Sequence, residues 1–551
     1  MNKLNYLFTI FITILTLLTF QNLFPQVNQE WAARYNGPGN DYDQAYSIAA
    51  DNTGNVYVAG QSFGSGTGSD YATIKYNSSG IQQWVRRYNG PGNDFDESFS
   101  LTIDSLSNVY VTGYSTGSGT GNDYATIKYN SSGLQQWVAR YNGTGNGSDK
   151  ASAIAVDDSG NVYVTGWSLG SVTGFDYVTI KYNSSGTEQW VSRIEAAGND
   201  YARSLAVDDS GNVYVTGYRF AVSNYDYCTV RYNSSGDVIW IAGYNGAGND
   251  EAFSIAADRS GNVYVTGFST DSIGSQDFET VKYNLNGMQQ WAAKYYNHGA
   301  NGGASSLTVD VFGNVYVTGS SLAGSTGYDF ATIKYNSDGD SLWTARYNGP
   351  DISSDDHSNS IAIDRSGNVY VTGYSSSAAT YEDYATVKYD STGMQQWEQR
   401  YSRPGFHRDA ATDIALDGSG NVYVTGYSSE DSGIPDYATI KYSQTTDITR
   451  ISSEIPEQFS LSQNYPNPFN PVTALEFGIS KSGFVSLKVY DILGKEAAAL
   501  VNEKLSPGNY KVEFDAGSLT SGVYFCRLAV SSSNPLTAYE FTEVKRMMLI
   551  R

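Results

Sequence analysis

Apolar and polar residues alternate in short runs along most of this chain, and no stretch has the spacing of a long amphipathic helix. In a representative unit, strand-forming runs lie at 100–104, 109–113, 123–129 and 135–141, separated by clusters of Gly, Asn and Ser. The second and third runs are apolar at successive positions, as in Val162, Tyr163 and Val164, which is typical of strands buried on both faces. The pattern predicts four short antiparallel strands per unit.

The unit recurs eight times between Trp31 and Tyr442, with one Trp in each copy: Trp31, Trp84, Trp137, Trp190, Trp240, Trp291, Trp343 and Trp397. A period of 50 to 54 residues is typical of propellers, solenoids or arrays. Four-stranded units repeated about an axis predict a β-propeller, here of eight blades. The repeats open on a fourth-type strand around Trp31 and end on a third-type strand at 436–442. We therefore expect the N-terminal strand to complete the last blade.

Three repeated segments resemble the SBBP family of secreted bacterial β-propeller repeats: G-N-V-Y-V-T-G-Y-S, D-Y-A-T-I-K-Y-N-S-S-G and W-x-x-R-Y-N-G-x-G-N-D. The resemblance covers roughly residues 30–443. It implies an extracellular propeller and brings no common enzymatic activity. Family members are often described as seven-bladed, so the eight copies of this chain depart from that description and leave seven blades as the alternative.

The first 26 residues predict a secretion signal peptide, because Lys3 is their only charge and Leu7 to Phe20 form an apolar run of 14 residues. That run is short for a bilayer span, although a retained membrane anchor is the alternative. The expected organisation is a signal peptide at 1–26, a propeller at 27–443, a linker at 444–457 and a C-terminal domain at 458–551.

The C-terminal domain has different sequence features. Strand-like runs broken by Gly494, Gly508 and Gly522 predict a small immunoglobulin-like β-sandwich. N-Y-P-N-P-F-N-P at 464–471 and S-G-V-Y at 521–524 resemble the C-terminal sorting domain of type IX secretion. The resemblance implies recognition by the type IX machinery and export to the medium or to the outer surface of a Gram-negative cell. A plain adhesive sandwich is the alternative.

The net charge of −22 disfavours nucleic acid as a partner, since a field of this sign repels phosphates. Only two cysteines occur, Cys228 and Cys526, and both are predicted to be buried apolar residues without a disulfide. We expect a monomer with no transmembrane segment in its mature form.

Three patterns resemble catalytic or metal sites but are interpreted as structural. G-x-S-x-G occurs around Ser62, Ser115 and Ser168, without the strand–turn–helix context that a nucleophile elbow needs. Asp157, Ser159 and Asn161 reproduce half of a calcium loop, but an Asx turn explains them without metal. An Asp opens the third strand of every copy and is interpreted as a loop or ion-pair residue. No cofactor is expected, with calcium as the alternative.

The copies differ most in the loops that join the fourth strand to the next first strand and the second strand to the third. In a propeller these loops lie on one face, which is where we expect ligand binding. The acidic and aromatic candidates there are Asp41, Tyr42, Asp43, Asp94, Phe95, Trp167, Tyr201, Phe220, Asp355, Asp356, His357 and Tyr381. The three histidines of the chain, His298, His357 and His407, fall in consecutive loops of this face and are candidate metal ligands.

Two hypotheses for function follow. The first is a non-enzymatic binding, adhesion or scaffold protein, with polysaccharide or a surface protein as its ligand. The alternative is a secreted carbohydrate-active enzyme, a lyase or glycosidase, that uses Asp355, Asp356 or His357.

Overall fold

The computed structural model describes residues 27–550 apart from 297–300, 323–326, 352–353, 379, 404–406, 430–432, 445–448, 453, 517–518 and 533–539. The described residues form strands and turns, with no helix among them. They fall into two compact units, one spanning Gln29–Tyr442 and the other taking in the described residues from Ser443 onward. The predicted signal peptide and His298 lie outside the described residues.

We number the sequence repeats 1 to 8 in chain order, and each of the first six forms its own four-stranded sheet. Repeat 1 contains β2 (Asp43–Ala50), β3 (Val56–Phe63), β4 (Ser69–Tyr76) and β5 (Gln82–Tyr88). Repeat 2 contains β6 (Asp96–Ile103), β7 (Val109–Thr116), β8 (Asn122–Tyr129) and β9 (Gln135–Tyr141). Repeat 3 contains β10 (Asp149–Val156), β11 (Val162–Leu169), β12 (Phe175–Tyr182) and β13 (Glu188–Ile194).

The next three repeats follow the same order. Repeat 4 contains β14 (Asp200–Val207), β15 (Val213–Phe220), β16 (Tyr225–Tyr232) and β17 (Val238–Tyr244). Repeat 5 contains β18 (Asp250–Ala257), β19 (Val263–Thr270), β20 (Gln276–Tyr283) and β21 (Gln289–Tyr295). Repeat 6 contains β22 (Gly302–Val309), β23 (Val315–Leu322), β24 (Tyr328–Tyr335) and β25 (Ser341–Tyr347).

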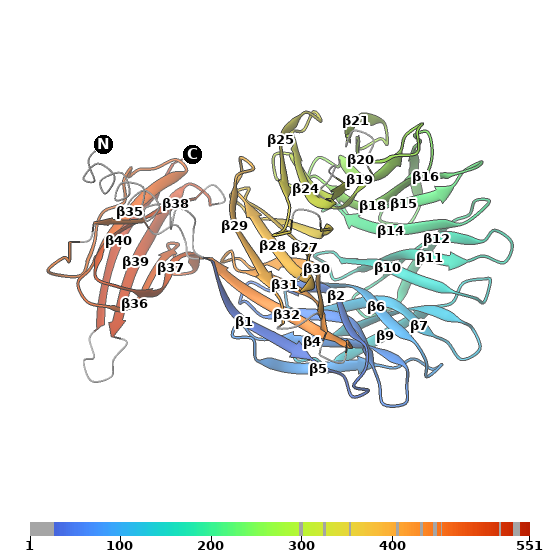
Figure 1. The fold of residues 1–551 in the computed structure, drawn as a ribbon, viewed down its shortest axis with the longest axis horizontal. Helices are drawn as coiled ribbons and strands as arrows, with labels where there is room; N and C mark the ends of the chain where they lie inside the picture. The colour runs from blue at the N-terminus through green and yellow to red at the C-terminus, as the bar shows by residue number, and fades with distance from the viewer. Residues whose placement is uncertain are drawn as a thin grey trace, which may run out of the picture. The chain divides into compact units, whose positions relative to one another are not determined.

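Repeats 7 and 8 share one sheet. Repeat 7 contains β26 (Asp356–Ile363), β27 (Val369–Ser377), β28 (Tyr381–Tyr389) and β29 (Gln395–Tyr401). Repeat 8 contains β30 (His407–Leu416), β31 (Val422–Ser429) and β32 (Pro435–Gln444). A short parallel bridge between β28 and β30 joins them, and β1 (Val27–Tyr35) lies beside β32. The first and last parts of the repeat region are therefore neighbours (Figure 1).

The first strand of each repeat is the innermost. Each of these strands contacts the first strand of the next repeat, and β30 contacts β2, so they surround a common axis. The second and third strands are buried on both faces, as in Val56, Tyr57 and Val58, which are 0% exposed. This burial confirms the prediction from continuous apolar runs. The unit is a β-propeller, because its repeated sheets radiate from that axis.

The repeated Trp forms a hydrogen bond to the next repeat in every described copy except that of Trp397. Trp84 Nε1 donates to the carbonyl oxygen of Ser131 in the following repeat at 3.2 Å, and Lys75 Nζ donates to the same oxygen at 3.2 Å. Gly133 of that turn has φ +80°, and a Cβ there would lie 2.7 Å from Trp84 Cδ2. The turn therefore needs Gly for its backbone conformation and for contact with the indole.

The same contact joins the N-terminal strand to repeat 1. Trp31 Nε1 donates to Ser78 O at 3.1 Å, and Lys441 Nζ donates to that oxygen at 3.4 Å. On the inner strands, Asp413 of repeat 8 accepts the Ile48 backbone N–H at 3.0 Å. The ends of the repeat region are thus held by the hydrogen bonds that hold neighbouring repeats elsewhere.

Inner strands are longer than the sequence pattern predicts. In repeat 2, the strand begins at Asp96 rather than Ser100, and its partner runs to Thr116 rather than Gly113. A β-bulge between Ser98 and Ser100 interrupts the register and hides this extension from a simple alternation rule. Residues assigned to variable loops therefore lie in strands.

The C-terminal unit contains two four-stranded sheets. One holds β33 (Thr449–Ser452), β34 (Ser460–Leu461), β35 (Val472–Ile479) and β38 (Gly508–Asp515), and the other holds β36 (Gly483–Tyr490), β37 (Glu496–Leu505), β39 (Gly522–Ser532) and β40 (Glu540–Leu549). Both sheets contribute to one core that includes Leu475, Leu487 and Leu528. Cys228 and Cys526 are free and buried in their respective units, as predicted.

The N-Y-P-N-P-F-N-P segment holds the end of the chain. Phe469 is 2% exposed, its N–H donates to Met548 O at 2.9 Å, and its carbonyl accepts the Ile550 N–H at 3.0 Å. Asn464 donates to Pro466 O and Thr473 Oγ1 at 3.0 and 2.9 Å. The motif therefore fixes the edge of the C-terminal unit where the last strand ends.

Candidate functional site

Several predicted binding residues lie inside the scaffold. Asp43 and Asp356 open inner strands and are 0% exposed. Asp43 accepts the N–H groups of Gly37 and Phe63, and Asp356 accepts the Gly349 N–H at 2.6 Å. Burial raises the pKa of both carboxyl groups, and these hydrogen bonds oppose the rise. The structure thus places Asp43 and Asp356 away from the exposed surface predicted for them, because each one holds a loop together.

The G-x-S-x-G serines also support the fold. Ser115 Oγ accepts a hydrogen bond from Arg140 Nη1 at 2.6 Å, and Arg140 Nη2 pairs with Asp123 at 2.8 Å. Ser62 and Ser168 accept from Arg87 and Arg193 in the same way. The Asp that opens the third strand is therefore an ion-pair residue in these repeats, and the serines are arginine-bound and 0% exposed.

The remaining loop candidates are exposed but lie apart. Tyr42, Phe95 and Tyr381 are 49%, 48% and 58% exposed. Phe95 packs edge-on against Phe63, and Tyr381 has φ +64°. The acidic loop candidates Asp41, Asp94 and Asp355 are also exposed. They belong to the loops and strand ends of repeats 1, 2 and 7.

A different surface is formed by positions at which the eight repeats differ and which the strand register brings together. The inner strand varies mainly at its second residue and at its bulge residue, and the second strand varies at its sixth and eighth residues. The register pairs the second inner-strand residue with the sixth residue of the next strand, as in Glu97 with Tyr114 and Tyr201 with Tyr218. Neighbouring positions keep their type, as in the V-Y-V that opens every second strand.

We call these three positions in every repeat the variable rim. Its second inner-strand residues are Gln44, Glu97, Lys150, Tyr201, Glu251, Gly303, His357 and Ala410. Its bulge residues are Tyr46, Phe99, Ser152, Arg203, Phe253, Ser305, Asn359 and Thr412. Its second-strand residues are Gln61, Tyr114, Trp167, Tyr218, Phe268, Ser320, Tyr374 and Tyr427.

The rim residues of a repeat lie together and also reach the next repeat. Gln61 Nε2 donates to Tyr46 Oη at 2.9 Å, which places the bulge residue beside its rim neighbours. Lys150 Nζ lies 3.8 Å from the ring centroid of Tyr114 in the preceding repeat. Burial lowers the pKa of Lys150, and Glu97 opposes the change. The rim is therefore a continuous surface around the axis, next to the variable loops.

Repeats 3 and 4 concentrate aromatic side chains on this rim, at Trp167, Tyr201 and Tyr218, and on the strand ends beside it, at Phe175, Phe220 and Tyr225. Trp167 lies 5.6 Å from Tyr201 between ring centroids, Tyr201 lies 5.3 Å from Tyr218, and Tyr225 lies 5.4 Å from Phe220. Arg203 donates to Tyr218 Oη at 2.6 Å. We call the following set the aromatic arc: Trp167, Phe175, Tyr201, Tyr218, Phe220 and Tyr225.

The arc contains three residues that the sequence predicted and three that it did not. Trp167, Tyr201 and Phe220 were candidates, whereas Phe175, Tyr218 and Tyr225 were missed, as was Arg203. A position-by-position comparison of the eight repeats contains the necessary signal, because these positions vary while their neighbours do not. The strand register is needed to bring the positions together.

The histidines do not form a shared site among the described residues. His357 is the second residue of β26, between the rings of Tyr328 and Tyr374 at 5.0 and 5.1 Å, and His407 opens β30. Both lie in strands rather than loops, because the strands extend past their predicted starts. Burial lowers the pKa of His357, and Asp355 opposes it. The described ranges hold no group of three or more His, Cys, Asp or Glu that suits a metal.

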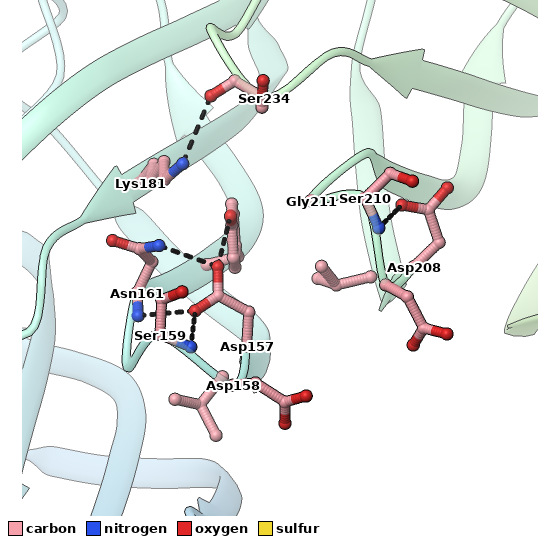
Figure 2. Close-up of a pocket in the computed structure, with 13 residues that line it drawn as sticks. Asp157, Asp158, Ser159, Asn161, Lys181, Asp208, Ser210, Gly211 and Ser234 are labelled. Carbon is pink, nitrogen blue, oxygen red and sulfur yellow. Dashed lines mark hydrogen bonds between the residues drawn. The ribbon is translucent and has the colours of Figure 1, made fainter.

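The opposite face, formed by the constant turns, contains a pocket of about 350 Å³ between repeats 3 and 4. Figure 2 shows the Asp157 carboxylate accepting the N–H groups of Ser159 and Asn161 at 2.9 Å each. The other oxygen accepts Asn161 Nδ2 at 2.8 Å and Tyr163 Oη at 2.9 Å. Burial raises the pKa of Asp157, but these bonds outweigh burial and lower it overall.

This hydrogen-bond pattern is that of an Asx turn. Donors already occupy both carboxylate oxygens of Asp157, and Lys181 Nζ also lines the pocket, where it donates to Ser234 O at 3.2 Å. The donor set at this turn therefore fits a structural role better than a calcium loop, which needs free carboxylate oxygens.

Repeats 4 and 5 depart from the arginine pattern. In repeat 4, Gly243 replaces the Arg of the fourth strand, and Arg219 stands opposite Asp226 where other repeats have Ser. In repeat 5, Lys294 replaces the Arg, and Glu279 occupies a position that is Ala in most repeats. Glu279 is 1% exposed, and burial raises its pKa to about 7 although Tyr244 and Lys294 oppose the rise.

The fold and the repeat define the protein as a β-propeller with a separate C-terminal β unit. The family described as "Beta-propeller repeat" matches residues 30–66, 83–119, 136–172, 189–218, 342–378 and 408–433. The family described as "Secretion system C-terminal sorting domain" matches residues 463–537. The chain is an SBBP-type β-propeller repeat protein with a type IX secretion sorting domain, and it is secreted or held at the outer cell surface.

No curated protein matches the chain significantly. Among solved structures, Sqt1 from Chaetomium thermophilum gives a TM-score of 0.49 at 9% identity, over 76% of this chain and 99% of its own. The polysaccharide lyase Uly1 gives 0.41 at 11%, over 65% and 92%. A fungal alcohol oxidase solved with copper gives 0.38 at 13%, over 80% and 96%. Likenesses of this strength do not indicate what the chain binds. Within the described residues, no helix has the length and apolarity to cross a membrane.

Proposed function

We propose that this protein is a non-enzymatic binding protein whose ligand contacts the variable rim and the loops beside it. One observation carries the proposal: the repeats keep the buried residues of their inner and second strands, and the positions that vary on these strands include three that the strand register brings together. Rigid strands also hold a binding surface more accurately than loops do.

We propose polysaccharide as the ligand class, with a surface protein as the other partner class. Half-buried aromatic rings beside charged and amide side chains suit a ligand with both apolar faces and hydroxyl groups. The acidic charge of the chain argues against nucleic acid. We further propose that the protein acts as a monomer and needs no metal for binding.

We also propose the number of blades, the type of the C-terminal domain and the domain boundaries. We propose a closed wheel of eight blades, with β1 as the outer strand of the last blade, supported by the Trp31 to Ser78 hydrogen bond. We propose that the C-terminal unit is an immunoglobulin-like sandwich, supported by its two sheets around one core. The proposed boundaries are 1–26, 27–443, 444–457 and 458–551, and the proposed partner of the last domain is the type IX machinery.

The carbohydrate-active enzyme is not favoured. Its proposed acid Asp356 is 0% exposed and bonded to a loop N–H, and His357 is packed between two tyrosine rings. Burial therefore keeps Asp356 from a substrate bond, and the two rings hold His357 in place.

The test is a binding screen of the secreted full chain against soluble polysaccharides, with and without a calcium chelator, followed by product analysis. We expect saturable binding that the chelator does not alter and no shortened products. Absence of saturable binding to every polysaccharide would contradict the ligand class, and chain cleavage would favour the enzyme.

A further inference from the structure

The charged groups of the aromatic arc limit what it can bind. Arg203 is exposed, and its guanidinium lies over the rings of Tyr201 and Tyr218 at 6.0 and 5.2 Å from their centroids. Glu251 of the next repeat interacts with it, since Arg203 opposes the burial that raises the pKa of Glu251. The guanidinium is therefore held against the rings with its charge balanced.

The other end of the arc has the same arrangement. Lys150 Nζ lies 3.8 Å from the Tyr114 centroid and 6.0 Å from that of Trp167. Glu97 of the preceding repeat faces this ammonium and offsets the effect of burial on its pKa. An acidic side chain of a neighbouring repeat thus acts on each of these two cations and reduces the positive charge that the arc offers to an anionic ligand.

The rings between the two charge pairs follow one another across the repeat boundary. Trp167 and Tyr201 meet at 5.6 Å and 83°, Tyr201 and Tyr225 at 6.3 Å, and Tyr225 and Phe220 at 5.4 Å. Phe220 is 37% exposed, and Trp167, Tyr201 and Tyr225 are half-buried. Neighbouring rings that are fixed by mutual contact present their faces with little loss of side-chain entropy on binding.

We propose that the aromatic arc binds the sugar rings of a neutral polysaccharide, with Arg203 and Lys150 donating hydrogen bonds to its hydroxyl groups. This inference rests on the proposed binding function, and it adds where the ligand binds and which class of polysaccharide the ligand is. The C–H faces of neutral pyranose rings pack on aromatic faces, and their hydroxyls accept from cations that already have an acidic partner. A uronic or sulfated chain would meet Glu97, Glu251 and a net charge of −22 without an unpaired cation.

The experiment compares soluble neutral glucan, xylan, mannan and galactan with polygalacturonate, using the full secreted chain and its intrinsic tryptophan fluorescence alongside calorimetry. The variants are Trp167→Ala and Tyr201→Ala in the arc, Trp167→Phe as the conservative change, and Phe312→Ala as a control at an exposed aromatic residue in a constant turn outside the rim. Thermal unfolding of each variant establishes that it folds.

We expect a neutral polysaccharide to bind, with at least tenfold weaker binding for folded Trp167→Ala and Tyr201→Ala. Trp167→Phe and Phe312→Ala should stay within about threefold of the wild type. If both arc variants bind the neutral polysaccharide as tightly as the wild type does, the arc is not its binding site, although the proposed binding function stands. Binding of polygalacturonate alone would overturn the ligand chemistry, and no binding to any of the five would overturn both proposals.

Discussion

Trp31 Nε1 donates a hydrogen bond to the carbonyl oxygen of Ser78, 3.1 Å away, across the junction between the N-terminal strand and the first repeat. Trp84 and Ser131 make the same bond within the array at 3.2 Å. Among the described residues, Trp397 Nε1 has no such partner, because the chain leaves repeat 8 after β32 instead of forming another turn.

Replacing Trp31 should therefore weaken the closure of the wheel. We expect Trp31→Ala to lower the free energy of unfolding by about 2–4 kcal/mol, since it removes a half-buried indole and its hydrogen bond. Urea unfolding and proteolysis near residue 35 would measure the effect. Trp84→Ala is the control within the array, and it should reduce stability without exposing the N-terminal strand. Unchanged proteolysis of Trp31→Ala would contradict the closing role.

The turn glycine that packs on each indole should tolerate no side chain. Gly133 has φ +80° and a Cβ there would lie 2.7 Å from Trp84 Cδ2, whereas Gly119 has φ +87° and open space around it. Both substitutions by Ala incur backbone strain of about 1 kcal/mol, and Gly133→Ala adds the clash. We expect Gly133→Ala to be the more destabilising by at least about 1 kcal/mol in urea unfolding. Equal losses would show that the indole contact is unimportant.

Glu279 should make stability fall as pH rises. Its pKa is raised by burial from 4.5 to about 7 in the folded protein, so the folded state holds a proton that the unfolded state has released between these values. Stability is therefore highest below about pH 4.5 as far as this group is concerned, and is lost as pH rises through 7, by at most about 3 kcal/mol.

The variant Glu279→Ala restores the residue found at this position in most repeats. We expect it to be more stable than the wild type at pH 8 and to gain less at pH 5, measured by urea unfolding. The groups that face Glu279 include Tyr244, Asp250, Asp277 and Lys294. If the stability of the variant and that of the wild type depend on pH in the same way, the dependence comes from those neighbours and not from Glu279.

Arg219 and Gly243 of repeat 4, where other repeats carry Ser and Arg, should behave as a coupled pair. Arg219 stands opposite Asp226 and opposes the burial that raises its pKa, and Gly243 stands where other repeats carry Arg. A Cβ at Gly243 would meet only Tyr227 O at 3.4 Å, so a side chain fits there. We expect Arg219→Ser to destabilise by about 1–2 kcal/mol and Arg219→Ser with Gly243→Arg to recover most of that loss. Additive effects in the double-mutant cycle would contradict the exchange.

The described strands lie close to the runs that the sequence predicts, because apolar runs and Asn, Asp and Gly turns are local signals. The third strand at Asn122–Tyr129 and the fourth at Gln135–Tyr141 lie within one residue of the predicted runs. The inner strand at Asp96–Ile103 begins four residues earlier than predicted, because its bulge breaks the alternation. Because inner strands and their partner strands are longer than predicted, Trp167, Tyr201 and His357 lie in strands rather than in the predicted loops.

The sequence by itself determined the repeat, the C-terminal sorting domain and the residues that hold neighbouring repeats, since each is written in local motifs that recur or match a family. Only the tertiary structure decided which variable residues form a surface. Tyr201 and Trp167 are 34 positions apart in the chain and belong to different repeats, yet their rings meet at 5.6 Å. Their contact depends on the strand register and on the packing of one sheet against the next, and neither is encoded by local periodicity.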